Sequence, residues 1–244
     1  MTGVMIVTGA SRGIGAAVAE LAARQGYAVC MTATSSISEA EAGAEAIRQN
    51  NGRAIAVRAD VGKEADIMSM FETVERELGP VTVLVNNAGI TGRGCRVEDI
   101  DLDTLSSSFG INVLGSYLCA REAVRRMSTA KGGQGGAIVN VSSRLSELGG
   151  SGEYVHYAAC KGAINSFTVG LAREVATEGI RVNAVSPGVI DTSIHVPGRL
   201  DRLTPMIPVQ RPGTAMEVAE TVMWLASDAA SYITGAVVPV SGGR

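Results

Sequence analysis

Residues 8–15 read T-G-A-S-R-G-I-G, and they stand between two segments of different character. The run before them, V-M-I-V at residues 4–7, is apolar and typical of a buried β-strand. The alanine-rich segment that follows, up to Gln25, is typical of a helix. Glycine tolerates positive φ and lets a backbone approach a ligand closely, and a helix N-terminus attracts phosphate. A strand, a glycine turn and a helix in this order predict a dinucleotide-binding unit.

The same alternation of strand and helix continues along the rest of the chain. No linker, shift in composition or fixed-period repeat interrupts it. Continuously apolar strands that alternate with helices are typical of a parallel sheet covered on both faces. We therefore expect one α/β domain over residues 1–244, doubly wound, with a seven-stranded parallel sheet. We expect strands at 3–8, 27–32, 54–59, 81–85, 137–141, 180–185 and 236–240, and helices up to 25 and at 38–50, 63–78, 102–127, 154–177 and 214–227.

The composition excludes several classes of protein. The 244 residues are 46% hydrophobic, enough for a large core, and a net charge of -3 leaves no basic footprint for nucleic acid. No apolar run approaches the roughly 20 residues that cross a bilayer, and the N-terminus does not resemble a signal peptide. Four cysteines without C-x-x-C spacing and two histidines predict reduced thiols and no metal site. We expect a cytoplasmic protein that binds neither membrane nor nucleic acid.

A second informative stretch, residues 142–161, reads S-S-R-L-S-E-L-G-G-S-G-E-Y-V-H-Y-A-A-C-K. On a helix Tyr157 and Lys161 lie four positions apart and share a face. An ordinary tyrosine has a pKa of about 10, and a nearby ammonium lowers it. A serine at the preceding strand end would polarise a carbonyl, so these residues predict a general acid–base site for a carbonyl/alcohol pair. Strand alternation favours Ser143 for this role, and Ser142 is the alternative.

The end of the second strand indicates which dinucleotide binds. Folds that prefer NAD usually carry an acid there, which binds the ribose 2′-hydroxyl. Residues 32–36 read T-A-T-S-S, and the next acid is Glu39. Arg12 in the glycine turn offers a guanidinium instead, which suits the 2′-phosphate of NADP(H) and makes NAD(H) the less favoured cofactor. The alternative is a solvated Arg12 and an enzyme without a preference.

Polar or glycine-rich motifs follow several of the other strands. Asp60 and Val61 follow the third, where Asp60 would cap the next helix or face an adenine. N-N-A-G at residues 86–89 follows the fourth strand, and Pro187-Gly188 the sixth. Ligands of open α/β sheets bind at these carboxyl ends. The proline-rich segment 193–211 is irregular, and we expect it to form a substrate-binding loop or a short mobile helix over the site.

Taken in order, these motifs resemble the short-chain dehydrogenase/reductase family over essentially the whole chain. The resemblance rests on T-G-x-x-x-G-x-G at 8–15, N-N-A-G at 86–89, Asn112 within a helix, a serine before Y-x-x-x-K at 157–161, and P-G at 187–188. The sequence is similar to bacterial 3-oxoacyl-[acyl-carrier-protein] reductases and glucose dehydrogenase-like oxidoreductases. This resemblance implies a Rossmann fold and an NADP(H)-dependent hydride transfer between nicotinamide and a carbonyl or secondary alcohol.

The resemblance also implies residue roles. Tyr157 would be the acid–base, Lys161 would lower its pKa and bind the nicotinamide ribose, and Ser143 would bind the substrate oxygen. Asn112 would hold a water that links Lys161 to solvent. The cofactor would be bound by Gly9, Ser11, Arg12, Gly13, Ile14, Gly15, Thr34 (at the 2′-phosphate), Asp60, Val61, Asn87, Ala88, Gly89, Tyr157, Lys161, Pro187, Gly188, Val189 and Thr192.

Three alternatives stay open at this point. The protein could be a catalytically silent NADP(H)-binding sensor or scaffold, although such proteins usually lose the Tyr or the Lys. As an enzyme it could reduce a 3-oxoacyl thioester or oxidise a sugar or polyol. A carrier protein would need a basic patch, for which the candidates are Arg121, Arg125 and Arg126, unless they form a solvated helix face.

Two further expectations concern surfaces. The helices at 102–127 and 154–177 carry apolar residues on more than one side, which predicts a homodimer or homotetramer, with burial inside the monomer as the alternative. The loop between Ser143 and Tyr157 contains Arg144, Glu147 and Glu153, so we expect a rim charged differently from that of the ketoacyl reductases.

Overall fold

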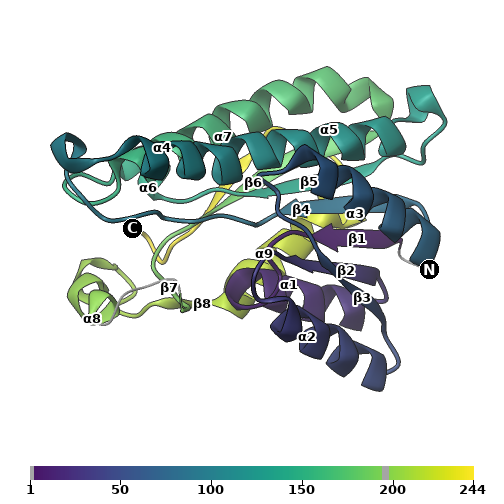
Figure 1. Ribbon diagram of the computed structural model, residues 1–244, viewed down its shortest axis with the longest axis horizontal. Coiled ribbons are helices and arrows are strands. Elements are labelled where there is room, and N and C mark those ends of the chain that lie inside the picture. Colours follow the sequence, from purple (N-terminus) through teal and green to yellow (C-terminus); the bar gives the residue numbers. More distant parts are fainter. Residues whose placement is uncertain (1–2, 194–197) are drawn as a thin grey trace.

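A seven-stranded sheet, in which all neighbouring strands are parallel, runs through the middle of the molecule (Figure 1). The computed structural model describes residues 3–193 and 198–244. The strands of this sheet are β1 (Val4–Val7), β2 (Ala28–Ala33), β3 (Arg53–Arg58), β4 (Val81–Asn86), β5 (Gly136–Val141), β6 (Ile180–Pro187) and β9 (Val237–Val240). Their order, β3-β2-β1-β4-β5-β6-β9, confirms the expected doubly wound fold.

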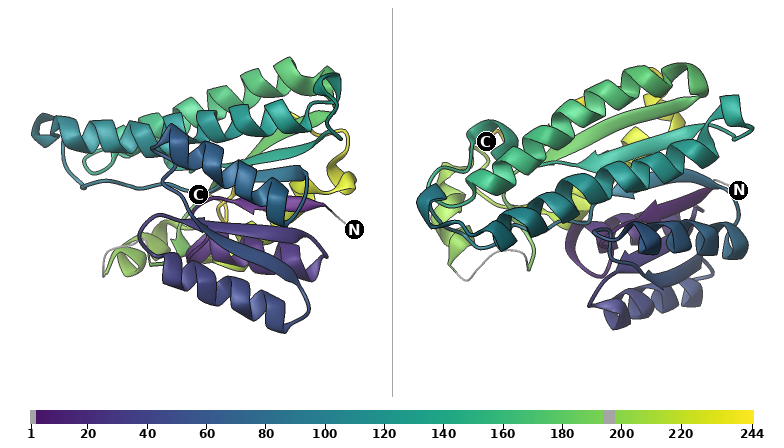
Figure 2. Two further views of the ribbon diagram at one scale, coloured as in Figure 1. Left: turned by 45° about the vertical axis from the view of Figure 1, so that its right-hand side comes forward. Right: turned by 45° about the horizontal axis from the view of Figure 1, so that its top comes forward.

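The sheet lies between two layers of helices, which the two views of Figure 2 show from different sides. One layer contains α1 (Gly13–Arg24), α2 (Ile37–Gln49) and α9 (Ala215–Ala226). The other contains α3 (Glu64–Glu77), α4 (Leu102–Phe109), α5 (Gly115–Met127) and α7 (Val155–Val175). Shorter elements are α6 (Leu145–Leu148), α8 (Arg199–Leu203), the strand pair β7 (Ile190–Asp191) and β8 (Gly213–Thr214), and the 3₁₀ turns Val97–Asp99, Thr129–Lys131, Ala176–Glu178, Thr204–Met206 and Asp228–Ala230.

Burial on both faces explains why the strands are apolar without alternation. In β1, Met5 and Val7 pack in the core on the α1–α9 side, while Val4 and Ile6 pack in the core on the α3–α5–α7 side. All four side chains are at most 5% exposed. A strand with helices on both faces has no side for polar residues, so the run V-M-I-V is what this position requires.

Two helix starts follow from local capping residues. The Thr214 hydroxyl accepts from the N–H of Glu217 at 3.2 Å, and the Glu217 carboxylate accepts from the N–H of Thr214 at 2.7 Å, which is the reciprocal capping box of α9. At α4 the Asp101 carboxylate accepts from the N–H of Thr104 at 2.6 Å. These contacts satisfy N–H groups that the helices themselves leave unpaired.

The long helix expected at 102–127 differs from the prediction. It is interrupted by a π-helical turn, Gly110–Leu114, between α4 and α5. The apolar pattern runs on through this turn, so the sequence gives no sign of it. In the segment 193–211, for which a loop or a short helix was expected, the chain forms α8 and a 3₁₀ turn, and residues 194–197 lie outside the described part of the chain. Within residues 3–193 and 198–244 no helix is long and apolar enough to span a membrane.

The switch in strand order falls between β1 and β4. Ile6 of β1 is in register with Cys30 of β2 on one side and with Leu84 of β4 on the other. From this point the chain progresses outward in both directions, so the loops at the carboxyl ends of β1 and β4 diverge. Such a divergence leaves a crevice that binds ligands in doubly wound sheets. In Figure 1, α6, α8 and the C-terminal end of the chain lie beyond the same carboxyl edge.

Candidate active site

A pocket of about 480 Å³ opens at the carboxyl ends of the strands. Its walls come from the segments after β1, β2, β3, β4, β5 and β6, and from α8. The sequence-predicted site residues line this pocket with two exceptions, Gly15 and Asn112. Residues from six strand ends, spread from position 9 to position 192, are thereby brought into one space.

The glycine turn after β1 forms one end of the pocket. Gly9 and Gly13 have φ of 63° and 58°, a conformation that L side chains rarely adopt. A Cβ on Gly15 would lie 2.5 Å from the carbonyl oxygen of Gly9 and from Asn87 Nδ2. Gly15 therefore serves close packing behind the turn and does not line the pocket. Its expected role as a direct cofactor contact stays a prediction.

The N-terminus of α1 faces the pocket and is open. Arg12, its N-cap residue, is extended and makes no side-chain capping hydrogen bond, and Arg12, Gly13 and Ile14 line the pocket. Helix N-terminal N–H groups without a side-chain cap favour an anion such as a pyrophosphate. This end of the pocket therefore fits a dinucleotide.

Asn87 and Thr8 hold the glycine turn against the end of β4. The Asn87 side chain donates to the carbonyl oxygens of Thr8 at 2.8 Å and Gly9 at 2.9 Å. The Thr8 hydroxyl accepts from the N–H groups of Asn87 and Ala88, both at 3.0 Å. The motif N-N-A-G thus shapes the phosphate end of the pocket as well as lining it.

The residues expected near the adenosine also line the pocket. Arg12 is exposed and forms no ion pair within the described part of the chain. Thr34 donates its hydroxyl hydrogen to the carbonyl oxygen of Ala59 at 3.2 Å. The Asp60 carboxylate accepts from the N–H of Gly62 at 2.9 Å, whereas α3 begins at Glu64. Asp60 therefore stabilises the turn after β3, and of the two expectations the helix cap is wrong.

Ser143, Tyr157 and Lys161 meet at the opposite end of the pocket. The end of β5 presents Ser143, and α7 presents the other two side chains. The Ser143 hydroxyl hydrogen-bonds the Tyr157 phenol and accepts from the N–H of Leu145 at 3.2 Å. Lys161 is 4% exposed, and its Nζ donates to the carbonyl oxygen of Val141 at 2.8 Å and lies 5.5 Å from the centroid of the Tyr157 ring.

The phenol and the ammonium are shifted by burial. Burial raises the pKa of Tyr157 to about 12, and the hydrogen bond from Ser143 only partly opposes this. Burial lowers the pKa of Lys161 to about 8. The expected lowering of the Tyr157 pKa is wrong for these residues alone, because loss of hydration outweighs the other influences on the phenol. Near neutral pH the phenol therefore carries its proton and can donate it.

Asn112 lies in the π-helical turn, fully buried behind Gly89. Its amide nitrogen donates to the carbonyl oxygens of Ile90 and Ser108, both at 2.8 Å, and its Oδ1 accepts from the N–H of Ile90 at 3.2 Å. The side chain thus ties the segment after β4 to the α4–α5 helix. A role in holding water near Lys161 stays a prediction.

Ser142 points away from the reaction centre toward α7. Its Oγ lies 2.6 Å from Asn165 Oδ1 and 3.2 Å from the carbonyl oxygen of Lys161, and the residue is 2% exposed. Of the two serines, only Ser143 hydrogen-bonds the Tyr157 phenol within the described residues. The geometry therefore supports the choice of Ser143 over Ser142.

Several pocket residues were not predicted as site residues. Tyr154, Arg144, Arg199 and Arg244 line the pocket, as do apolar residues of α6 and α8. Arg199 and Arg244 are distant in sequence from the serine and tyrosine motifs. The sequence indicated such residues only through the charged loop between Ser143 and Tyr157, which predicted an unusually charged rim of the site.

The three arginines of α5 do not form a free basic patch. Glu122, whose side chain is 4% exposed, accepts from Arg121, Arg125 and Arg126, and Arg121 also pairs with Glu64. Burial works to raise the pKa of Glu122, but hydrogen bonds from Arg126 and Arg121 and the arginine charges lower it overall. The arginines thus neutralise a buried carboxylate and nearby acids, which argues against a free basic patch. Arg125 is 54% exposed, in keeping with the solvated helix face that was the alternative.

The described residues contain no group of three His, Cys, Asp or Glu side chains that could hold a metal ion. The four cysteines are free thiols, three of them buried and Cys95 half-buried.

Fold and site together define a class of protein. A family model described as enoyl-(acyl carrier protein) reductase matches residues 9–244. The chain belongs to the short-chain dehydrogenase/reductase family of oxidoreductases, which bind a nicotinamide cofactor.

Three known proteins illustrate the similarity. An uncharacterized oxidoreductase of Escherichia coli is 46% identical over 245 residues, covering 99% of each chain. A 3-oxoacyl-[acyl-carrier-protein] reductase of Pseudomonas aeruginosa is 40% identical over 243 residues, covering 98% of this chain and 96% of the relative. A short-chain dehydrogenase of Burkholderia cenocepacia, solved in complex with NADP, has a TM-score of 0.93 and 32% identity, covering 100% of this chain and 98% of the other.

Proposed function

We propose that this protein is an NADP(H)-dependent oxidoreductase that interconverts a carbonyl compound and a secondary alcohol, with Tyr157 as acid–base. One observation carries the proposal. Ser143, Tyr157 and Lys161 share a pocket with a glycine turn and an open helix N-terminus. A proton donor at one end and a phosphate site at the other are what such a reaction needs.

The residues of the pocket fit the cofactor along its length. The N-terminus of α1 would hold the pyrophosphate, and Asp60 and Val61 would flank the adenine. Pro187 to Val189 and Thr192 would lie at the nicotinamide end, with Lys161 near its ribose. When bound, the nicotinamide supplies the hydride for reduction or accepts it in oxidation.

The choice of NADP(H) over NAD(H) rests on the adenosine end. Arg12 is exposed at the pocket wall without an ion pair in the described residues, and Thr34 follows β2 where an acid would select NAD. A free guanidinium binds a phosphate through several donors. The NADP in the Burkholderia relative supports the same choice.

In the reduction direction, Tyr157 donates its phenolic proton to the substrate oxygen as the alcohol forms. Ser143 hydrogen-bonds the same oxygen and holds it beside the phenol. Since burial holds the pKa of Tyr157 at about 12, the phenol is protonated before the reaction and ready to act as an acid. In the oxidation direction the phenolate has to form first, and the positive charge of Lys161 would stabilise it.

The other expectations from the sequence concern a silent sensor, a carrier-bound substrate, the oligomeric state and the location. Nothing in the site favours a silent sensor or scaffold, because the serine, tyrosine and lysine are all in place. The α5 arginines offer no free patch for an acidic carrier protein, which argues against a carrier-bound 3-oxoacyl thioester as the only substrate. A homodimer or homotetramer and a cytoplasmic location stay predictions.

Replacement of Tyr157 tests the proposal. Tyr157→Phe removes the transferable proton and keeps the ring, so turnover should fall by at least about 100-fold while NADPH binding stays unchanged. Carbonyl-dependent NADPH oxidation and NADPH fluorescence would measure the two properties. Tyr232→Phe, at a fully exposed tyrosine, is the control. Near-normal turnover by Tyr157→Phe would remove Tyr157 from the reaction.

A further inference from the structure

Three arginines line the pocket at the end where Tyr157 and Ser143 lie. Arg144 directly follows Ser143, Arg199 lies at the start of α8, and Arg244 lies against Arg144. The sole acidic residue among the described pocket-lining residues is Asp60, at the adenine end. The charged side chains at this end of the pocket are therefore all cationic, although the whole chain carries a net charge of -3.

Arg199 is the best placed of the three. Its side chain is 12% exposed, and its guanidinium carbon lies 4.7 Å from the centroid of the Tyr154 ring, which also lines the pocket. One of its nitrogens pairs with Glu153. A guanidinium has five N–H donors, so this pair leaves donors of Arg199 available to a ligand in the pocket.

The charge of Arg199 is only partly compensated. Glu153 divides its two carboxylate oxygens between Arg199 and Arg202, so one negative charge faces two positive charges. Arg202 is 58% exposed and is not part of the pocket wall, and Glu153 is not part of it either. The member of this group that faces the pocket is thus a cation.

Arg144 shows the same arrangement. Its Nε donates to a main-chain oxygen of Arg244 at 2.8 Å, and its Nη1 pairs with Glu147. The Arg144 side chain is 19% exposed and lines the pocket, whereas Glu147 is 52% exposed and lies outside the wall. On both sides of the reaction centre the arginine therefore faces inward and its carboxylate partner outward.

We propose that the substrate of this enzyme carries an oxyanion, a carboxylate or a phosphate, which Arg199 and Arg144 bind while its carbonyl lies at Ser143 and Tyr157. This inference rests on the proposed function and names the chemical class of its substrate. Half-buried guanidinium groups bind planar oxyanions through paired donors, and a neutral substrate would leave them without a partner in the pocket.

The experiment compares matched substrates and matched variants. The substrates are a series of oxo acids of increasing chain length, their methyl esters, and dihydroxyacetone phosphate against dihydroxyacetone. The variants are Arg199→Gln and, as its control, Arg202→Gln. Both arginines lie on α8 and pair with Glu153, but only Arg199 lines the pocket.

The expected result is selective. Arg199→Gln raises KM for the anionic substrate by about 10- to 100-fold, as loss of a charge-assisted contact predicts. It changes kcat little, and it changes KM for the methyl esters little. Arg202→Gln leaves both substrates near their wild-type values. Preference for oxo acid or for phosphate tells which oxyanion binds. An equal rise in KM for acid and ester, or equal effects of the two variants, overturns the inference. Arg199 would then have only the structural role of linking α8 to Glu153.

A binding measurement separates this inference from the proposed function. Calorimetry of the NADP⁺-loaded protein with an oxo acid and its ester requires no turnover. One outcome is that the wild type binds the oxo acid, Arg199→Gln does not, and no substrate leads to NADPH consumption. That outcome supports the anion site and contradicts the proposed function. Turnover of neutral carbonyls, with no preference for acids, does the reverse. Absence of both turnover and selective binding contradicts both.

Discussion

Arg12 is the residue on which the cofactor preference depends. Arg12→Ala removes the guanidinium from the pocket wall, and we expect the preference for NADPH over NADH to fall by about 10- to 100-fold, mainly through KM for NADPH. Steady-state kinetics with both cofactors measure this. Arg24→Ala, at the other end of α1, is the control because Arg24 is exposed and outside the pocket. An unchanged preference in Arg12→Ala would remove Arg12 from cofactor selection.

Lys161 illustrates a cost in stability at a catalytic position. Its pKa of about 8 in the folded protein lies below the ordinary value of 10.5, so folding disfavours its charged form. Below pH 8 the lysine is charged in both the folded and the unfolded state, so the full free-energy cost of burying the charge lowers the stability. Between pH 8 and 10.5 the unfolded chain binds more protons than the folded one, so this contribution to stability improves as pH rises.

Lys161→Met should therefore be more stable than the wild type at pH 7 without cofactor, by up to about 3 kcal/mol. The lost hydrogen bond to Val141 reduces this gain. Urea unfolding of both proteins at pH 7 and pH 10 measures the free energies, and the advantage of the variant should shrink at pH 10. A difference that is independent of pH would show that burial of the charge is not its origin.

At the scale of elements, the π-helical turn between α4 and α5 places Asn112 behind Gly89. A Cβ on Gly89 would lie 2.6 Å from Asn112 Oδ1 and 3.5 Å from Lys161 Nζ. The first distance is too short and the second is an ordinary contact, so Gly89→Ala should displace Asn112 beside Lys161. We expect kcat/KM to fall by about 10-fold or more, in line with the sensitivity of catalysis to displacements near 1 Å.

Gly110→Ala is the matched control for this substitution. Gly110 is helical, and a Cβ there meets nothing within 4 Å, so it should keep wild-type kinetics and gain roughly 0.5–1 kcal/mol of stability. Kinetics and thermal unfolding of the two variants measure these effects. Wild-type kinetics in Gly89→Ala would show that the contact with Asn112 and Lys161 is not needed.

The elements themselves were largely predictable, because continuous apolar runs and glycine turns are local signals. The π-helical turn was not. Asn112 in this turn hydrogen-bonds Ile90, 22 positions away, and no periodicity shows a contact at that distance. The close packing of Gly15 was not predictable for a similar reason, since its neighbour Asn87 comes from a different strand end.

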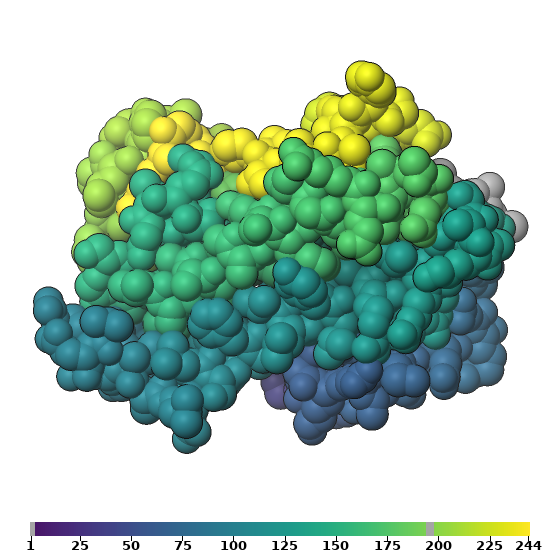
Figure 3. Space-filling model, turned by 90° about the horizontal axis from the view of Figure 1, so that it is seen from above, coloured from purple at the N-terminus to yellow at the C-terminus, as the bar shows by residue number. Residues whose placement is uncertain are grey.

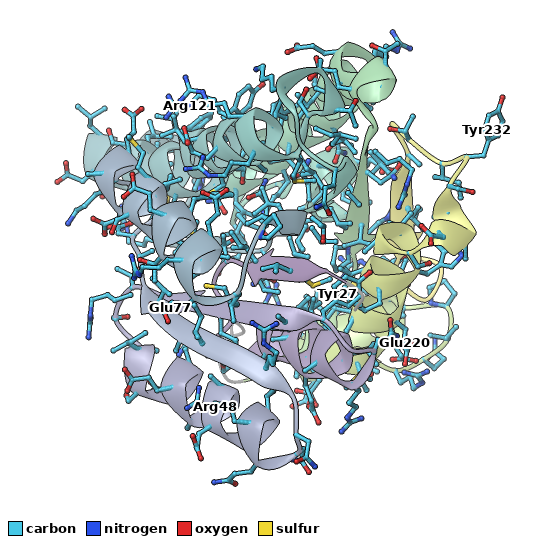
Figure 4. The ribbon with its side chains drawn as sticks, turned by 90° about the vertical axis from the view of Figure 1, so that its right-hand side faces the viewer. Tyr27, Arg48, Glu77, Arg121, Glu220 and Tyr232 are labelled. Carbon is cyan, nitrogen blue, oxygen red and sulfur yellow. The ribbon has the colours of Figure 1, made fainter. Side chains whose placement is uncertain are left out.

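At the scale of the whole molecule, α4–α5 and α7 lie side by side and form much of one face (Figure 3). Leu114, Tyr117 and Val155 on these helices are 60%, 44% and 41% exposed. The rings of Tyr117 and Phe167 stack at 3.7 Å between centroids and join the two helices into one apolar surface. Exposed apolar surface of this kind marks an interaction site. Tyr232, fully exposed, projects from a separate part of the surface (Figure 4).

We expect light scattering to give at least twice the chain mass of 25.1 kDa. Leu114→Glu places a charge on the apolar face and should lower the mass, whereas Met68→Glu on α3, also exposed, should not. A wild-type monomer at micromolar concentration would contradict the expected association.

The whole-molecule arrangement limits what sequence could show about the site. Residues at the carboxyl ends of parallel strands share one edge, so the glycine turn and Ser143 followed from their positions, and Tyr157 and Lys161 followed from their spacing on one helix. The substrate end did not, because Arg199 reaches Glu153 across 46 positions and only the folded chain brings α8 over the pocket.

The central claim is that the pocket performs an NADPH-dependent reaction on a carbonyl. The most direct test is NADPH oxidation by the wild-type protein against acetoacetyl thioesters, diketones, aldehydes, quinones, keto sugars and oxo acids, with NADH in parallel. We predict turnover of at least one class, faster with NADPH than with NADH. Tight NADPH binding without turnover of any class would contradict the claim and favour a sensor.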